Sequence, residues 1–407
     1  MASSGRRLKI AVVVHGRWDA FDLTRALLAR GAEARLYTNY PRWAVSRFGV
    51  PEHVVRSFVV HGALARVLAR LPAGGADWRR DALLHPVFGR WAARQLGAEG
   101  WDVAYIFSGV AEESFRGLAD RPTLRVLVRE SSHIRTQDAL LADEERRTGC
   151  PQQRPSRWMI AREEREYALA DVIRSLSTFS YRSFLEHGLP PDRLKLVLSG
   201  APLDRFQAAP EVIEARRQRI LAGDPLRVLQ VGTFTMRKGA WDTAAVVRAL
   251  DPARFHVRFV GPVATDARTL ADELADRGAV FVAKQPEASL PAAYAWGDVF
   301  LLPTIEDGFQ AVLAQAAASA LPILTTPNGA GHDLVREGRS GWVVPIRSPE
   351  RIAARLHWAD AHRPELAAMV DDTARRFRPR DFAAVASELE DVCRAARAAR
   401  SRSPAGA

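Results

Sequence analysis

Two acidic residues, Glu306 and Asp307, stand directly before Gly308 in the second half of the sequence. The residues before them, 299–302, form an apolar run too short for a helix, which predicts a strand buried on both faces. The alanine-rich residues after them, 309–320, favour a helix. In an open parallel sheet, ligands bind at the carboxyl ends of the strands, where a helix N-terminus also offers unpaired N–H groups. Carboxylates at such a turn are well placed to bind the hydroxyl groups of a ligand.

The stretch from residue 298 to residue 345 resembles the donor-sugar signature of family 4 glycosyltransferases, which are retaining enzymes of the two-domain GT-B fold. In that signature a buried strand is followed by Pro-Ser or Pro-Thr, then by an acidic residue, Gly-Phe and a helix that leads into the next strand. This chain has Pro303-Thr304 and Gly308-Phe309 at the matching places. The resemblance is strongest over residues 226–345 and weaker over residues 8–206.

The sequence departs from the signature at three positions. Gln310 replaces a second glycine, Gln315 replaces a second glutamate, and Ala320 replaces the glycine before Leu-Pro. The family places its first acidic residue eight positions before the second. Counting back eight positions from Gln315 gives Asp307, so we favour Asp307 as the first acidic residue, with Glu306 as the alternative.

The resemblance also implies which residues bind the donor diphosphate. Lys238 stands before a glycine in the loop after a predicted strand at residues 226–231, as in the family, and Arg237 precedes it. Two cations there would stabilise the charge that the diphosphate gains as the glycosidic bond breaks. Thr233 stands where the family usually has an arginine, so we expect Arg237 to supply the second cation, with Arg17 as an alternative.

Two residues of the first half follow predicted strands. Gly16 comes after the apolar run 8–14, and in the family this loop approaches the donor diphosphate, although a plain turn is the alternative. His133 comes shortly after the apolar run 124–128, and one branch of the family has a similar Ser-Ser-His-Ile there. The resemblance therefore implies that His133 lies near the reacting carbon, whereas a lone histidine is more often structural.

The implied catalytic residues are His133, Asp307 and Glu306. The implied contacts to the donor sugar and nucleoside are Gly308, Phe309, Gln310 and Gln315.

The length of 407 residues suits two domains of about 200 residues each. Short apolar runs alternate with helix-favouring segments, which predicts an α/β fold with doubly wound sheets. With the resemblance, we expect the GT-B fold, in which two Rossmann-like domains face each other across a donor and acceptor cleft. We place the acceptor domain at residues 1–209 and the nucleotide-sugar donor domain at residues 210–380. Residues 381–407 are expected to form a helix that crosses back onto the first domain and ends in a frayed tail from residue 401.

The formal net charge of +11 and the isoelectric point near 10.3 call for an anionic partner. No nucleic-acid-binding motif accompanies the charge, so we expect phosphorylated substrates and no nucleic acid. Residues 61–96 alternate apolar residues with arginines, which predicts either a helix with a solvated basic face or one that contacts an anionic membrane. The acceptor is expected to be a carbohydrate, a glycolipid or another small molecule.

No run of 18 apolar residues occurs, and the first seven residues lack the apolar core of a signal peptide. We therefore expect a cytoplasmic protein, with peripheral contact at the inner face of the membrane if residues 61–96 bind lipid.

The sequence shows neither the Asp-x-Asp pair of metal-dependent glycosyltransferases nor an HExxH motif, so we expect no essential metal and no cofactor besides the nucleotide-sugar co-substrate. Cys150 and Cys393 have no spacing typical of a disulfide framework or a zinc site. Two other interpretations stay open. One is a non-catalytic GT-B protein that binds sugar nucleotides beside a partner transferase, and the other is a GT-B epimerase or glycan phosphorylase.

Overall fold

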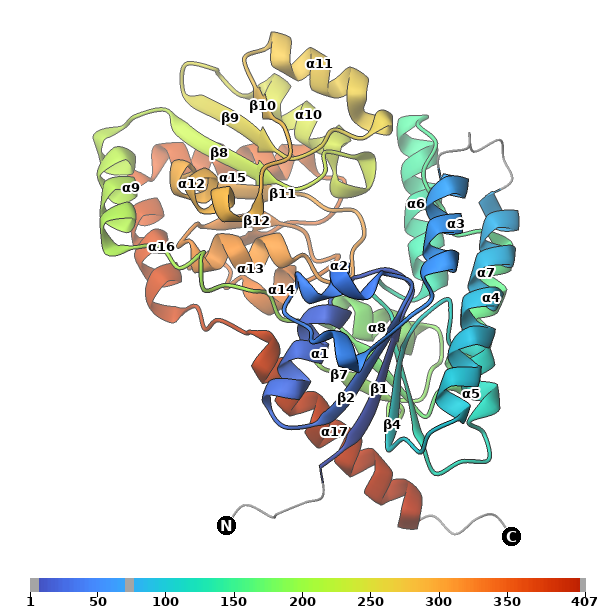
Figure 1. Cartoon of the computed structure of the whole chain (residues 1–407). Helices are drawn as coiled ribbons and strands as arrows, with labels where there is room; N and C mark the ends of the chain where they lie inside the picture. The colour runs from blue at the N-terminus through green and yellow to red at the C-terminus, as the bar shows by residue number, and fades with distance from the viewer. Residues whose placement is uncertain (1–6, 70–76, 403–407) are drawn as a thin grey trace.

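The computed structural model describes residues 7–69 and 77–402, which form two α/β domains, each built on a parallel sheet (Figure 1). The first sheet has the strand order β3-β2-β1-β4-β5-β6-β7, and the second has the order β10-β9-β8-β11-β12-β13. In each domain the first strand lies inside the sheet and the order reverses beside it, which is the doubly wound arrangement. The predicted pair of Rossmann-like domains is therefore confirmed.

The strands of the first sheet are β1 (Lys9–Val14), β2 (Glu33–Thr38), β3 (Val55–Ser57), β4 (Val103–Phe107), β5 (Leu124–Val128), β6 (Val172–Ser175) and β7 (Leu194–Leu196). Those of the second sheet are β8 (Leu226–Val231), β9 (Phe255–Val260), β10 (Val280–Val282), β11 (Val299–Leu302), β12 (Ile323–Thr325) and β13 (Gly341–Val343). Strands β4 and β11 are buried along their whole length, because helices cover both faces of a doubly wound sheet.

The helices of the first domain are α1 (Ala20–Ala29), α2 (Arg42–Ser46), α3 (Val59–Ala69), α4 (Asp77–Gly97), α5 (Glu112–Gly117), α6 (Ile134–Thr148), α7 (Arg157–Leu169) and α8 (Thr178–Glu186). The helices that follow are α9 (Pro210–Ala222), α10 (Ala240–Ala249), α11 (Arg268–Asp276), α12 (Leu290–Trp296), α13 (Ala311–Ala318), α14 (Gly331–Leu334), α15 (Pro349–Ala361), α16 (Arg363–Arg376) and α17 (Phe382–Arg402). The basic segment that we predicted over residues 61–96 corresponds to α3 and α4, and its residues 70–76 lie outside the described residues.

Helix α17 leaves the second domain and lies along the first (Figure 1). Its residues Phe382, Val385, Leu389 and Cys393 are buried in the core formed with α1 and the first sheet. The helix continues through Arg402, past the point where we expected a frayed tail, and residues 403–407 of that tail lie outside the described residues.

Two glycines bring the loops of the site together. Gly239 has a φ of +81°, and a Cβ atom there would lie 2.1 Å from the carbonyl oxygen of Pro303. A Cβ atom on Gly308 would lie 2.4 Å from the carbonyl oxygen of Glu130. Only glycine permits such approaches. As a result, the loops after β8 and β11 contact each other, and the turn at Gly308 contacts the first domain.

Candidate active site

A cavity of about 800 Å³ lies between the two domains. It faces the carboxyl ends of β1, β4 and β5 on one side and of β8 and β11 on the other, which is where doubly wound sheets bind ligands. The first domain lines it with His15, Trp18, His85, Phe107, Ser108, Gly109, Val128, Arg129, Glu130, Ser131, Gln137, Leu141, Pro151, Gln152, Gln153, Met159 and Glu163. The second domain lines it with Thr233, Thr235, Arg237, Lys238, Ala264, Thr265, Asp266 and Asp307.

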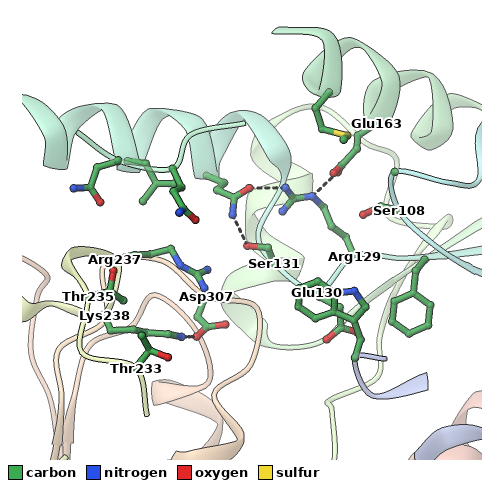
Figure 2. Close-up of a pocket in the computed structure, with 18 of the residues that line it drawn as sticks. Ser108, Arg129, Glu130, Ser131, Glu163, Thr233, Thr235, Arg237, Lys238 and Asp307 are labelled. Carbon is green, nitrogen blue, oxygen red and sulfur yellow. Dashed lines mark hydrogen bonds and ion pairs between the residues drawn. The ribbon is translucent and has the colours of Figure 1, made fainter. Parts of the chain in front are cut away.

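The wall of the second domain carries two cations and a carboxylate. The ammonium group of Lys238 forms an ion pair with Asp307 (Figure 2). Asp307 Oδ1 also accepts a hydrogen bond of 2.9 Å from the backbone N–H of Gly308. Burial lowers the pKa of Lys238 to about 7, and the adjacent Arg237 acts in the same direction, whereas the carboxylate of Glu306 favours the ammonium form. An anionic ligand would stabilise the charged form of Lys238 further.

The turn that presents these cations is held by Asp266. Asp266 Oδ2 accepts hydrogen bonds from Thr235 Oγ1 at 2.6 Å and from the backbone N–H of Met236 at 3.2 Å. The backbone carbonyl of Arg237 accepts a 2.9 Å hydrogen bond from the N–H of Ile305 in the loop after β11. Lys238 is therefore held between two loops whose backbones are bonded to each other.

Glu306 connects the two domains. Its side chain is fully buried and accepts hydrogen bonds from Ser131 Oγ, from the N–H and Oγ of Ser132 at 3.1 and 2.8 Å, and from Gln137 Nε2 at 3.2 Å. Arg237 Nη1 lies 3.3 Å from Glu306 Oε2. Burial favours the neutral acid, but Arg237 and these hydrogen bonds outweigh it and hold the pKa of Glu306 below its ordinary value. Glu306 is therefore an ionised link between the domains, and it does not line the cavity, whereas Asp307 does.

On the first domain, Arg129 anchors the loop after β5. Its guanidinium group donates to Glu163 Oε2 at 2.5 Å (Figure 2). It also donates to Gln137 Oε1 at 2.8 Å and to the carbonyl oxygen of Ser132. Glu163 and other acidic neighbours raise the pKa of the buried Arg129 above its ordinary value, although burial acts against this. These contacts hold Ser131 and Ser132 in place to donate to Glu306.

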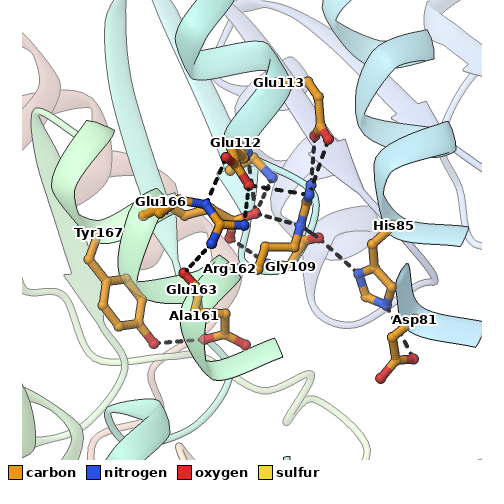
Figure 3. A network of polar contacts seen from close by, with 12 residues as sticks. Asp81, His85, Gly109, Glu112, Glu113, Ala161, Arg162, Glu163, Glu166 and Tyr167 are labelled. Atoms are coloured by element: carbon orange, nitrogen blue, oxygen red, sulfur yellow. Dashed lines mark hydrogen bonds and ion pairs between the residues drawn. The ribbon is translucent and has the colours of Figure 1, made fainter. Parts of the chain in front are cut away.

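A second polar network lies behind the loop after β4 (Figure 3). The buried carboxylate of Glu166 accepts from the N–H groups of Gly109 at 2.6 Å and of Ala111 at 2.9 Å, at the start of α5. The carbonyl oxygen of Gly109 accepts from Arg162 Nε at 2.6 Å and lies 2.9 Å from His85 Nδ1. This network positions Gly109 and His85 on the cavity wall.

His133 lies behind the wall, because it caps the N-terminus of α6. Its Nδ1 atom accepts from the N–H of Arg135 at 3.3 Å, and its ring stacks on His187 at 4.1 Å between centroids. Tyr167 and Phe184 pack against the same ring. Burial, with His187 nearby, lowers its pKa to about 3. The ring is thus a neutral, packed side chain that does not line the cavity, and this placement does not support the contact that we expected between His133 and the reacting carbon.

Five other residues of the expected site also lie outside the cavity lining, and one of them, Gly308, forms the turn that contacts Glu130. Gly16 donates its N–H to Asn39 Oδ1 at 3.0 Å. Phe309 packs against the core of the first domain. Gln310 Oε1 accepts from the N–H of Ala330 at 2.8 Å, and Gln315 Oε1 accepts from the hydroxyl group of Tyr294 at 2.8 Å. Both glutamine side chains therefore form bonds within the second domain.

The sequence interpretation missed several residues on the first-domain wall. Arg129 and Glu130 come directly after β5, and this position at the carboxyl end of a strand was the available signal for both. His15, directly after β1, carried the same signal. Trp18 and His85 carried no such signal in the sequence, because their position in the cavity wall depends on how α1 and α4 pack.

Comparisons with known proteins agree with this architecture. Residues 225–359 match the sequence model of the family described as glycosyl transferases group 1. Among curated proteins, the D-inositol 3-phosphate glycosyltransferase of Corynebacterium glutamicum is 30% identical over 225 residues, which is 51% of each chain. A GDP-mannose-dependent alpha-(1-6)-phosphatidylinositol monomannoside mannosyltransferase of Mycobacterium tuberculosis is 27% identical over 197 residues, which is 45% of this chain and 51% of the relative. The chain thus spans about half the length of the curated relatives it matches.

The fold itself extends over nearly the whole chain. The crystal structure of Anabaena HepE in complex with UDP covers 95% of this chain and 100% of its own, with a TM-score of 0.67 and 13% sequence identity. Together with the two doubly wound sheets, this likeness identifies the fold. The chain has the GT-B fold, and residues 225–359 of its second domain match the family described as glycosyl transferases group 1.

Proposed function

We propose that the protein is a retaining glycosyltransferase of family 4, which transfers a sugar from a nucleotide-diphosphate sugar to a glycan, lipid-linked or small-molecule acceptor. The observation that carries this proposal is the cavity between the domains, whose second-domain wall presents Lys238 and Arg237 beside Asp307. The cations suit a diphosphate and the carboxylate suits sugar hydroxyls. The UDP bound by HepE and the GDP-mannose dependence of the mycobacterial relative support a nucleotide-sugar donor.

In the proposed reaction the bond between the anomeric carbon and the diphosphate oxygen breaks, and the acceptor oxygen bonds to the same carbon from the same face. The proton of the acceptor hydroxyl passes to the departing diphosphate. Lys238 and Arg237 stabilise the negative charge that grows on this group, and Asp307 orients the sugar. We propose that these side chains suffice without an essential metal.

The test is a thermal-unfolding panel with UDP-, GDP-, ADP- and dTDP-sugars in the presence of EDTA. A ligand at about a hundred times its Kd stabilises the native state by about 2.7 kcal/mol. We expect one class of nucleotide sugar to raise the unfolding temperature by several degrees and to undergo transfer or slow hydrolysis. If none binds, even with Mg²⁺ restored, the proposed function is wrong.

One observation favours a second candidate, a non-catalytic protein that binds sugar nucleotides beside a partner transferase. Gln310 and Gln315 stand at signature positions of the family and form bonds within the second domain. Nucleotide-sugar binding without transfer to any acceptor, and without hydrolysis, would select this candidate.

We also propose that the acceptor is held at an anionic membrane. Helix α3 exposes an apolar stripe, because Val60, Leu64 and Val67 follow the i, i+4, i+7 spacing of one helix face and are 76%, 43% and 58% exposed. Exposed apolar stripes of this kind mark interaction surfaces. Arg66 on α3 and Arg79 on the next helix, α4, are exposed, and they would attract anionic headgroups. No helix in the two described ranges combines the length and apolarity needed to span a bilayer.

The prediction for this surface is a loss of vesicle binding in the variant Val60→Glu/Leu64→Glu/Val67→Glu. We expect its co-sedimentation with vesicles of phosphatidylcholine and phosphatidylglycerol to fall by about tenfold or more, since three apolar contacts are lost and three like charges are added. Leu221→Glu is the matched control, because Leu221 is 51% exposed on α9 of the second domain. Equal binding by wild type and triple variant, or an equal loss with Leu221→Glu, would contradict the proposal.

A further inference from the structure

A carboxyl group of the first domain enters the cavity beside the donor-side turn. Glu130 follows β5 and lines the cavity, and its backbone lies directly against Gly308. Figure 2 shows Glu130 and Asp307 in the same pocket, contributed by different domains. The first-domain position nearest the signature turn is therefore held by Glu130, where the sequence had pointed to His133.

Glu130 lies beside a second buried carboxyl group, that of Asp19 at the N-terminus of α1. Glu130 Oε1 and Asp19 Oδ1 are both buried, and neither has a donor group from another side chain or backbone N–H among the described residues. Two ionised carboxylates cannot donate to each other. One proton held between them gives both oxygens a partner.

The charges around the pair fit a single proton. Arg174 is the cation beside it, fully buried, with Nη1 3.6 Å from Asp19 Oδ2 and 2.6 Å from the hydroxyl oxygen of Tyr105. Ser199 Oγ donates to Asp19 Oδ2 at 3.3 Å. Burial raises the pKa of Glu130 well above its ordinary value and Asp19 adds to this, while Arg174 acts against it. One arginine and one negative charge shared by two carboxyl groups leave the cluster neutral overall.

We propose that Asp19 and Glu130 share one proton, and that Glu130 binds a hydroxyl group of a sugar held in the cavity. The sugar-binding half of this inference rests on the proposed function. A cluster that is neutral with Arg174 suits the place, because the same cavity must accept an anionic diphosphate, and a second uncompensated carboxylate would repel it. The hydroxyl group belongs either to the transferred sugar or to the acceptor, and the binding experiment separates these sources.

The shared proton is tested without any ligand. The side-chain carboxyl carbons of the protein labelled with ¹³C-glutamate are followed by NMR between acidic and alkaline pH. We expect a resonance that keeps the chemical shift of a protonated acid at neutral pH and that is absent from Glu130→Gln. If every resonance lost in Glu130→Gln has the shift of an ionised carboxylate at neutral pH, the shared proton is overturned.

The sugar contact is tested by calorimetry with UDP, UDP-glucose, GDP and GDP-mannose on wild type, Glu130→Ala and Glu130→Gln. If Glu130 contacts the transferred sugar, Glu130→Ala should weaken the affinity for the nucleotide sugar about tenfold and leave the affinity for the free nucleotide unchanged. For a contact with the acceptor, donor affinity is unchanged and the KM for the acceptor rises by a similar factor. Glu130→Gln should stay within about threefold of wild type, because its amide donates to Asp19 and keeps a carbonyl oxygen for the hydroxyl group.

Two results overturn the sugar contact. One is that Glu130→Ala has the same donor Kd and acceptor KM as wild type. The other is that Glu130→Gln loses as much affinity as Glu130→Ala, which would show that an ionised carboxylate is needed. If wild type binds no nucleotide, the proposed function fails and the sugar contact fails with it, while the NMR titration still decides the shared proton.

Discussion

Lys238→Ala is expected to weaken nucleotide-sugar binding roughly a hundredfold, about 3 kcal/mol, with little change in the folded structure. The substitution removes the cation that is paired with Asp307 and leaves this carboxylate facing the diphosphate without compensation. The measurement is the Kd of UDP-glucose and GDP-mannose by calorimetry. Lys195→Ala is the control, because Lys195 lies on β7 and does not line the cavity.

Two further comparisons sharpen this test. Asp307→Asn in the Lys238→Ala background should recover part of the affinity, since it removes the uncompensated carboxylate. Because burial lowers the pKa of Lys238 to about 7, wild-type affinity for UDP-glucose should fall as pH rises from about 6 to about 8, and Lys238→Ala should not show this fall. A Kd in Lys238→Ala within about threefold of wild type would refute the diphosphate role.

Much of the fold could be predicted because the central strands are continuous apolar runs. Residues 8–14, 103–107 and 299–302 form β1, β4 and β11, which differ from these runs by at most one residue at an end. A strand buried on both faces leaves such a run, whatever the rest of the chain does. Helix ends were less predictable. Helix α13 begins at Ala311, because Gln310 is extended and bonded to the loop at Ala330.

Two residues of the second-domain wall could be placed from sequence, because each stands in a loop after a predicted strand. Lys238 and Asp307 lie in loops after adjacent strands of one sheet, and both line the cavity. The order of sheet strands and the signature turn were enough to place them.

The first-domain half could not be placed in this way. Arg129, Glu130, Ser131, Ser132 and His133 all follow β5, and any of them could have faced the cavity on spacing alone. Which of them do so depends on tertiary contacts. Arg129, Glu130 and Ser131 line the cavity, whereas Ser132 donates to the buried Glu306 and His133 caps α6 behind the wall. A pattern of residue types carries no information on such distant partners.

Glu306→Ala is expected to lower kcat/KM for sugar transfer by roughly a hundredfold while the Kd of the free nucleotide changes only a few-fold. The substitution leaves Ser131, Ser132 and Arg237 without their shared acceptor, and hydrogen bonds to a charged group contribute about 1.5 to 3 kcal/mol each. Water that enters the gap offsets part of this loss, so we expect about 3 kcal/mol in total. The closed arrangement of the domains should then be less populated, and the radius of gyration from X-ray scattering should increase.

The matched control separates this carboxylate from domain contacts in general. Asp333 on α14 also links the domains, because its carboxylate accepts from the N–H of Thr178 at 3.0 Å, yet it does not line the cavity. Asp333→Ala should therefore cost much less activity than Glu306→Ala. Equal losses in the two variants would show that any interdomain contact has the same effect, and full activity in Glu306→Ala would show that the link at Glu306 is dispensable. The larger loss at Glu306 is expected because its carboxylate oxygens contact both walls of the cavity. One contact is Arg237, which is next to Lys238, and the other is the loop after β5, which carries Glu130 into the cavity.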